Sequence, residues 1–262
     1  MTTQELNDEF ENNRSKLRSF VFRLTANKAD TDDIVQETYI KASAKLYTFK
    51  GASSLKTWIF SIAANLAKDD LRSKKRWSSD AMDLAKAETL RDPDKYLSQF
   101  LRINSTPTGI FELNEHINFC FTCIGKTLDV DQQVVILLKE VFGFKVAEIA
   151  EIINDTEGVV KHALVDARKI MQDTFEQRCS LINKAGVCYQ CSELNGIFNP
   201  KQNFQEEKLK AGLHNDSHDK TSDQLFDIRA RIAQAIDPFS CTGPDIHFFH
   251  FEHVTNVLNS KE

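Results

Sequence analysis

Four polar residues near the N-terminus could bind a basic partner surface: Asp32, Asp33, Gln36 and Glu37. In a helix they share one face, because positions three and four apart are neighbours on a helix surface. Carboxylates and an amide grouped in this way can pair with cations on another protein and fix its register. The alternative is an ordinary solvated helix face. The pattern predicts an acidic protein-binding surface.

A second polar set lies along the margin of the apolar stretch that contains Trp58. These polar residues could contact single-stranded nucleic acid. The members of this set are Lys56, Asn65, Lys68, Arg72, Lys74, Lys75 and Arg76. The loop before this stretch contains Phe49, Lys50 and Ser54, and it is the best candidate for a pocket that holds an extruded base. A solvated helix end is the competing interpretation of the basic cluster.

The cysteines suggest metal or redox chemistry, because six of them occur in a chain whose N-terminus lacks the apolar region of a signal peptide. Cys179, Cys188 and Cys191 have a spacing that suits zinc. His214, His218, Cys241 or one of His247, His250 and His253 would supply a fourth ligand. A redox switch and inert buried thiols are the alternatives. Cys120 and Cys123 fit a buried core better than a metal site, although the two CxxC pairs could also meet in one Cys₄ site. No other cofactor is expected.

Three helices are predicted before residue 77 from apolar residues at helical spacing. The first buries Leu17, Phe20, Val21 and Leu24. Asp30 is expected to cap the second, which buries Val35, Tyr39, Ala42 and Leu46. The third carries an apolar stripe of Leu55, Trp58, Ile59, Ile62, Ala63 and Leu66. These helices should form one small domain.

Residues 78–112 lack steady periodicity and are predicted to be a linker with one short helix, 95–102. A helix then buries Ile117, Cys120, Ile124 and Leu128, and Asp129 with Gln132 forms a capping box for the next. Two further helices, joined by a turn at 154–156, form a predicted helix-turn-helix. The last has an apolar set of Val159, Val160, Ala163, Leu164 and Ala167. Thr156, Glu157, Lys161, His162 and Arg168 are the candidate DNA-binding residues of this pair.

Composition supports a helical protein that binds nucleic acid with help. Only 9 glycines and 5 prolines occur in 262 residues, which favours helices over turn-rich sheets. The net charge is −5, whereas a DNA binder that acts alone usually carries a basic excess. The longest aliphatic run, 134–138, is too short to span a membrane. A cytoplasmic location is expected, with no membrane partner.

Three segments of the sequence, taken in chain order, resemble the extracytoplasmic-function (ECF) group of bacterial RNA polymerase sigma factors. Residues 33–38, Asp-Ile-Val-Gln-Glu-Thr, are similar to the polymerase-binding segment, and Phe49 with 55–65 and 70–72 is similar to the promoter-melting segment. Glu148-Ile149-Ala150, Val160-Lys161 and Ala167-Arg168 resemble the helix-turn-helix that binds the upstream promoter element.

The resemblance implies an all-α fold and a protein that is not an enzyme. Residues 1–77 would be sigma region 2, 78–112 a linker, 113–175 sigma region 4 and 176–262 a C-terminal extension. Core RNA polymerase and promoter DNA would be its partners, and an anti-sigma factor is a further candidate. Asp32, Asp33, Gln36 and Glu37 would bind polymerase, and the basic and loop residues named above would bind DNA.

The C-terminal extension (residues 176–262) is expected to regulate activity. Five of its phenylalanines could dock it on the second domain: Phe198, Phe226, Phe248, Phe249 and Phe251. The competing hypothesis for the whole chain is a stand-alone helix-turn-helix regulator with a metal- or redox-sensing tail. An enzyme has little support, because no nucleophile–base pair or phosphate loop stands out.

Overall fold

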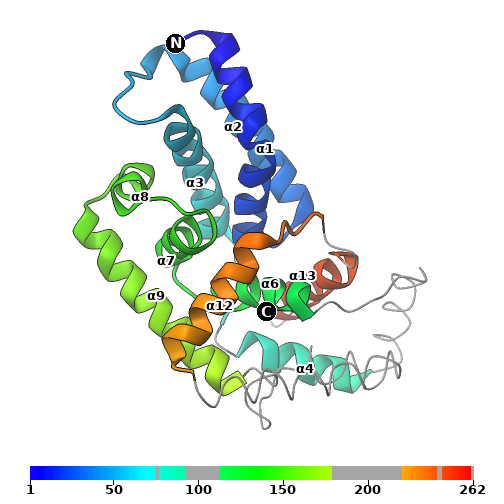
Figure 1. Ribbon diagram of the computed structural model, residues 1–262. Helices are drawn as coiled ribbons and strands as arrows, with labels where there is room; N and C mark the ends of the chain where they lie inside the picture. The colour runs from blue at the N-terminus through cyan, green and yellow to red at the C-terminus, as the bar shows by residue number, and fades with distance from the viewer. Residues whose placement is uncertain (75–76, 79, 93–112, 179–219, 241–243, 261–262) are drawn as a thin grey trace. The chain divides into compact units, whose positions relative to one another are not determined.

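The protein is all-α throughout the part of the chain that the computed structural model describes, as predicted (Figure 1). The described residues are 1–74, 77–78, 80–92, 113–178, 220–240 and 244–260. They divide into two compact units. Unit 1 contains residues 1–76, 128–168 and 237–239, and unit 2 contains 77–127, 169–236 and 240–262.

The N-terminal part of unit 1 is a bundle of three helices: α1 (Thr3–Thr25), α2 (Lys28–Lys45) and α3 (Leu55–Ser73). Each of the three contacts the other two. The predicted apolar face of α1 is fully buried. Asn27, and not Asp30, caps α2, because the Asn27 side chain accepts a hydrogen bond from the Asp30 backbone N–H at 3.1 Å. A short 3₁₀ helix, η1 (Leu46–Thr48), follows α2.

The buried face of α3 differs from the predicted stripe. Trp58, Ile62 and Leu66 are only half-buried, whereas Ile59 and Ala63 of the predicted stripe are fully buried. The fully buried set is Ile59, Phe60, Ala63, Ala64 and Ala67. Alanines permit close approach of neighbouring helices, so the buried face includes all three alanines of α3 and leaves part of the predicted stripe at its edge. The prediction for α2 also fails at Tyr39, which is 36% exposed.

The second part of unit 1 contains α7 (Val130–Ile136), the π-helical turn η2 (Leu137–Val141), α8 (Val146–Ile153) and the first half of α9 (Glu157–Arg178). The predicted capping box of Asp129 and Gln132 is present, and in it the Asp129 N–H donates to Gln132 Oε1 at 3.2 Å. Helix α3 packs against both α7 and α8. Phe60 of α3 lies 5.0 Å from Phe144 between ring centroids, and Phe20 of α1 lies 5.6 Å from Phe142.

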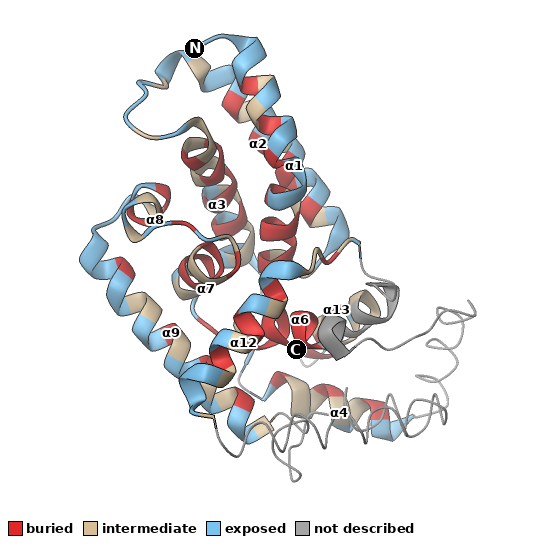
Figure 2. Cartoon of the chain, viewed as in Figure 1, coloured by how far each residue is buried: buried red, intermediate tan, exposed pale blue. Residues whose placement is uncertain are grey.

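Unit 2 is built around α6 (Leu113–Gly125), with α4 (Ala81–Arg91), α12 (Ser222–Ala235) and α13 (Pro244–Asn259). Helix α12 packs on α6, and α13 packs on both α4 and α6. All residues of α6 from Ile117 to Ile124 are buried, so this helix is covered on every side (Figure 2).

Three of the five predicted docking phenylalanines of the extension do contact the predicted second domain. Phe226 lies 5.8 Å from Phe121 of α6, and Phe248 and Phe251 lie 6.0 and 5.8 Å from Phe119. Phe249 instead stacks on His253 of its own helix. Phe198 lies outside the described residues.

Helix α4 lies in the segment predicted to be a linker. Its buried residues are Ala81, Ala85 and Thr89, which recur every four positions but are too small or too polar to stand out as an apolar stripe. The helix predicted at 95–102 lies outside the described residues.

His253 of α13 is a titratable group in the packing of unit 2. Its Nε2 lies 3.0 Å from Thr89 Oγ1 and 3.4 Å from the Ala85 carbonyl oxygen. Burial lowers the pKa of His253 below its usual value, against a smaller opposite effect of the Ala85 carbonyl and Glu88. The folded protein therefore holds a proton on this ring less readily than the unfolded chain does.

The first prediction concerns stability at acid pH. The contribution of His253 is fully present above about pH 6.5, the usual histidine pKa, and falls as the pH drops from there toward the lowered pKa. We expect the wild-type free energy of unfolding, measured by urea titration, to fall more between pH 7.5 and 5.5 than that of His253→Gln. His162→Gln, at an exposed position, is the control and should behave like wild type. Equal pH dependence of all three proteins would contradict this role.

Candidate functional site

The predicted acidic surface lies on α2. Its opposite face is buried in unit 1 through Ile34, Val35 and Ala42. Asp32, Asp33 and Gln36 are exposed, and Glu37 is half-buried. The fold therefore brings the four predicted residues to the outer side of one helix.

Two of these carboxylates have partners within unit 1. Arg18 of α1 contacts both oxygens of Asp32, at 2.7 Å from Nε and 3.2 Å from a terminal guanidinium nitrogen. Glu37 lies 3.5 Å from the Lys41 ammonium, one turn along α2. The acidic surface thus already includes a cation from the neighbouring helix, and sequence reasoning missed Arg18 because the pair joins two separate helices.

The predicted base-binding loop is held at both ends. The Phe49 ring packs on Trp58 with 5.3 Å between centroids. Ser54 Oγ caps α3 by accepting a hydrogen bond from the Thr57 N–H at 3.0 Å. Gly51 has a φ of 73°, a value that side-chain-bearing residues rarely adopt. Lys50 is exposed between these anchors, so it is the predicted loop residue whose side chain is most available to a ligand.

Most of the described cations of α3 are already paired. Lys68 lies 2.6 Å from Asp131 of α7, and Arg72 lies 3.9 Å from the same carboxylate. Lys56 sits 4.4 Å above the Phe144 ring. Asn65 is exposed. Nucleic acid that binds here must therefore replace intramolecular partners.

Lys74, just after α3, is bound by two carboxylates, Asp30 at 2.6 Å and Asp70 at 2.8 Å. Partial burial opposes its charge, but the hydrogen bonds that Lys74 donates to these carboxylates, with their negative charges, outweigh burial and raise the pKa of Lys74. The remaining predicted cations, Lys75 and Arg76, lie outside the described residues.

The helix-turn-helix is present as predicted, with α8 and α9 joined by a tight turn. Asn154 closes α8 at a positive φ of 55°, and Thr156 Oγ1 accepts the Val159 N–H at 3.3 Å at the start of α9. Thr156, Glu157, Lys161 and His162 are all exposed. Val159 is 44% exposed, against the prediction that it belongs to the apolar face. The exposed side of the second helix begins with these residues.

Arg168 differs from the other candidates of α9. Two of its nitrogens bind the two oxygens of Glu140 in η2, at 3.0 and 3.1 Å. Glu140 is only 13% exposed, so this bidentate pair is part of the packing that holds α9 against η2.

Sequence reasoning also missed Tyr47. This residue is 88% exposed in η1, two positions before Phe49. An aromatic ring exposed beside a candidate base pocket is suited to stacking. Its signal in the sequence was an aromatic residue close to the predicted base-binding loop.

The predicted metal ligands Cys179, Cys188 and Cys191 lie outside the described residues. Within the described ranges no cluster of three or more histidine, cysteine or acidic side chains could hold a metal. Cys120 and Cys123 are buried in α6 and form no disulfide, which agrees with the core interpretation.

Two protein-family models match this chain. The model for Sigma-70 region 2 matches residues 10–77, and the model for Sigma-70, region 4 matches residues 121–171. The ECF RNA polymerase sigma-E factor of Salmonella typhimurium is 31% identical over 162 residues, 62% of this chain and 81% of that protein. This chain belongs to the ECF sigma factor family.

Two other curated relatives agree with this assignment. The ECF RNA polymerase sigma-E factor of Haemophilus influenzae is 30% identical over 57% of this chain and 77% of that protein. ECF RNA polymerase sigma factor SigX of Bacillus subtilis is 26% identical over 61% and 78%. The sigma factor RpoE of Bartonella quintana, solved with the anti-sigma factor NepR, aligns with 65% of this chain and 96% of its own at 22% identity, with a TM-score of 0.45.

Family membership establishes this sigma factor as a DNA-binding transcription initiation factor whose partners are core RNA polymerase and promoter DNA. The stand-alone regulator is not favoured. Among the described helices, none combines the length and apolar character needed to cross a bilayer.

The second prediction separates a structural residue of α9 from an exposed one. Arg168→Ala leaves the Glu140 carboxylate without its bidentate partner and should lower the free energy of unfolding by about 1–3 kcal/mol. Lys161→Ala removes an exposed charge and should change it by less than about 0.5 kcal/mol. Urea denaturation of both variants measures the difference. A double-mutant cycle with Glu140→Ala gives the coupling between the pair, and zero coupling would contradict the structural role.

Proposed function

We propose that this sigma factor binds core polymerase through the outer face of α2, formed by Asp32, Asp33, Gln36 and Glu37. The observation that carries the proposal is the division of α2 into a buried apolar face and an exposed acidic one. A carboxylate cluster on a rigid helix suits a basic partner surface, because complementary charges guide encounter and fix register. The protein acts in the cytoplasm and is not an enzyme.

The loop between Phe49 and Ser54, together with the polar margin of α3, contacts the unwound promoter strand. Support comes from the loop geometry: its ends are anchored on Trp58 and at the start of α3, while Lys50 is exposed. A flipped base needs a pre-formed pocket and an aromatic or cationic neighbour. Tyr47 is suited to be the aromatic neighbour of such a base, and Lys50 is suited to be the cationic one.

The exposed start of α9 contacts the upstream promoter element in the major groove. Thr156, Glu157, Lys161 and His162 present hydrogen-bonding groups at the end of the helix that enters the groove. Arg168 serves this surface indirectly, by holding α9 against Glu140.

The C-terminal extension regulates these activities. Its helices α12 and α13 belong to the core of unit 2, so a change in the extension can reach the helices that it covers. Zinc held by Cys179, Cys188 and Cys191 is one means of ordering the segment, and an anti-sigma factor is a further candidate regulator.

The third prediction tests the acidic face. Asp33→Ala combined with Glu37→Ala should weaken binding to core polymerase, because it removes two of the three charges of the face. Since both side chains are at the surface, the stability should change by no more than about 0.5 kcal/mol per substitution. Equilibrium binding to purified core measures the effect, with Glu151→Ala, an exposed acid of α8, as the matched control. Unchanged binding of the double variant would reject this face as the polymerase contact.

The fourth prediction tests the upstream contact. Lys161→Ala should reduce transcription from a promoter that has its upstream element, by an amount that corresponds to about 1–3 kcal/mol for one good base contact. The same variant should have little effect on a promoter whose upstream element has been replaced. Equal losses on both templates in a reconstituted assay would show that Lys161 acts elsewhere.

A further inference from the structure

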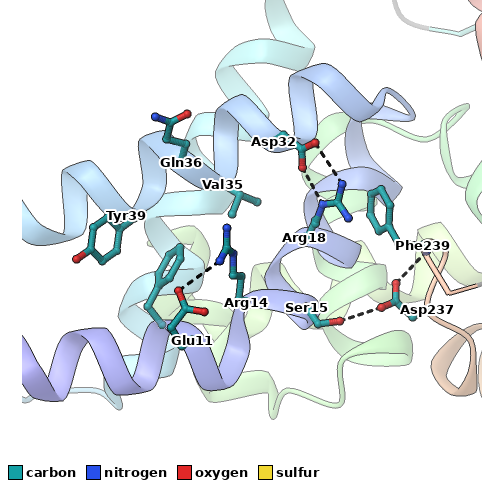
Figure 3. Close-up of a pocket in the computed structure, with 11 residues that line it drawn as sticks. Glu11, Arg14, Ser15, Arg18, Asp32, Val35, Gln36, Tyr39, Asp237 and Phe239 are labelled. Atoms are coloured by element: carbon teal, nitrogen blue, oxygen red, sulfur yellow. Dashed lines mark hydrogen bonds and ion pairs between the residues drawn. The ribbon is translucent and has the colours of Figure 1, made fainter.

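A groove runs along the outer side of the α1–α2 pair and encloses a cavity of about 820 Å³ (Figure 3). Arg14, Ser15 and Arg18 line it from α1, and Asp32 and Gln36 line it from α2. Asp237 and Phe239 also line it, from a segment more than two hundred residues away in the sequence, Asp237-Pro238-Phe239, which belongs to unit 1. We refer to residues 237–239 as the DPF segment.

The DPF segment is held in the groove by polar and aromatic contacts. Ser15 Oγ donates a hydrogen bond to Asp237 Oδ2 at 2.8 Å. The Arg18 guanidinium carbon lies 3.7 Å from the centroid of the Phe239 ring, a cation–π distance. The same ring packs edge-on against Phe22 of α1, with 5.1 Å between centroids. Carboxylate and ring therefore each have a partner of matching chemistry on α1.

The segment is also arranged to present these two groups. The other oxygen of Asp237 accepts the Phe239 N–H at 3.1 Å, a turn in which an aspartate bonds the backbone two residues on. Pro238 between them is buried and restricts the backbone. The chain thus arrives at the groove with the carboxylate and the ring already oriented toward α1.

The groove overlaps the acidic face of α2. Asp32 and Gln36 line it, and Asp32 is bound by Arg18, the residue that Phe239 covers (Figure 3). Arg18 contacts both the Asp32 carboxylate and the Phe239 ring, so a basic partner that replaces Arg18 on Asp32 competes with an arginine held by two contacts. The contact between residues 18 and 239 therefore favours the ion pair of Arg18 with Asp32.

We propose that the DPF segment is an intramolecular competitor of core polymerase for the α1–α2 groove. The proposal rests on the function proposed above for Asp32 and Gln36. The docked segment stabilises the Arg18–Asp32 pair and occupies the adjacent groove, and polymerase binds after the segment leaves. The extension thereby acts on region 2 directly, in addition to its place in the core of unit 2.

Weak contacts are sufficient for such competition. A tethered segment meets its site at an effective concentration on the order of millimolar. The apparent affinity of the partner is then reduced by the fraction of molecules whose groove is open. If the groove is closed in about nine molecules of ten, removing the segment raises the affinity for core about tenfold.

The fifth prediction uses the full-length protein with two substitutions, Asp237→Ala and Phe239→Ala, which remove both anchoring groups. Binding to purified core polymerase should tighten by up to about tenfold relative to wild type. Asp227→Ala, at an exposed carboxylate of α12 outside the groove, is the matched control and should bind like wild type. Circular dichroism establishes that each variant is folded.

A second measurement observes the docking itself. In protein with labelled arginine, the Arg18 side-chain protons should be shifted upfield by the Phe239 ring. Phe239→Leu or addition of core should remove the shift. Unchanged or weaker binding of core by the double variant, or an Arg18 shift that persists in the complex with core, would overturn the proposal. Failure of the acidic-face assignment is distinct: binding would then be insensitive to Asp33 and Glu37.

Discussion

The burial of small residues along α3 is the constraint on which the rest of unit 1 depends. Ala63, Ala64 and Ala67 are fully buried, and their lack of bulk lets α3 contact α1, α2, α7 and α8. Phe60 extends the same contact by packing on Phe144. A larger residue at any of these alanines would force the helices apart, since cores have little spare volume. The functional side chains are consequently confined to the polar margins of the helices.

This confinement explains why so many cations of unit 1 are paired with its own acids. Lys68 and Arg72 lie against Asp131, and Lys74 lies between Asp30 and Asp70. The exposed pairs contribute little to stability. These pairs instead create competition, because a phosphate that binds at one of these cations must replace a carboxylate.

Local patterns in the sequence sufficed for most helices, for the helix-turn-helix and for the acidic face of α2. Each depends on periodicity, capping and turn residues within a few positions. They were insufficient where the partner is distant: Arg18 with Asp32, Arg168 with Glu140, and residues 237–239 with α1. They also failed for α4 and for the buried side of α3, because alanines mark a close helix contact and not an apolar stripe.

The extension cannot be treated as a detachable regulator. Residues 117–124 of helix α6 are all buried, and Phe119 and Phe121 among them are covered by Phe226, Phe248 and Phe251 of the extension. Phe251 also contacts Trp77, with 6.0 Å between the ring centroids. Deletion of the extension would expose this apolar surface to water, at a cost that scales with the area uncovered. A loss of activity after deletion of the extension would then reflect lost packing as well as lost regulation. Substitution at the groove, where the DPF segment meets α1 through one hydrogen bond and one ring, separates the two effects because the core of unit 2 stays intact.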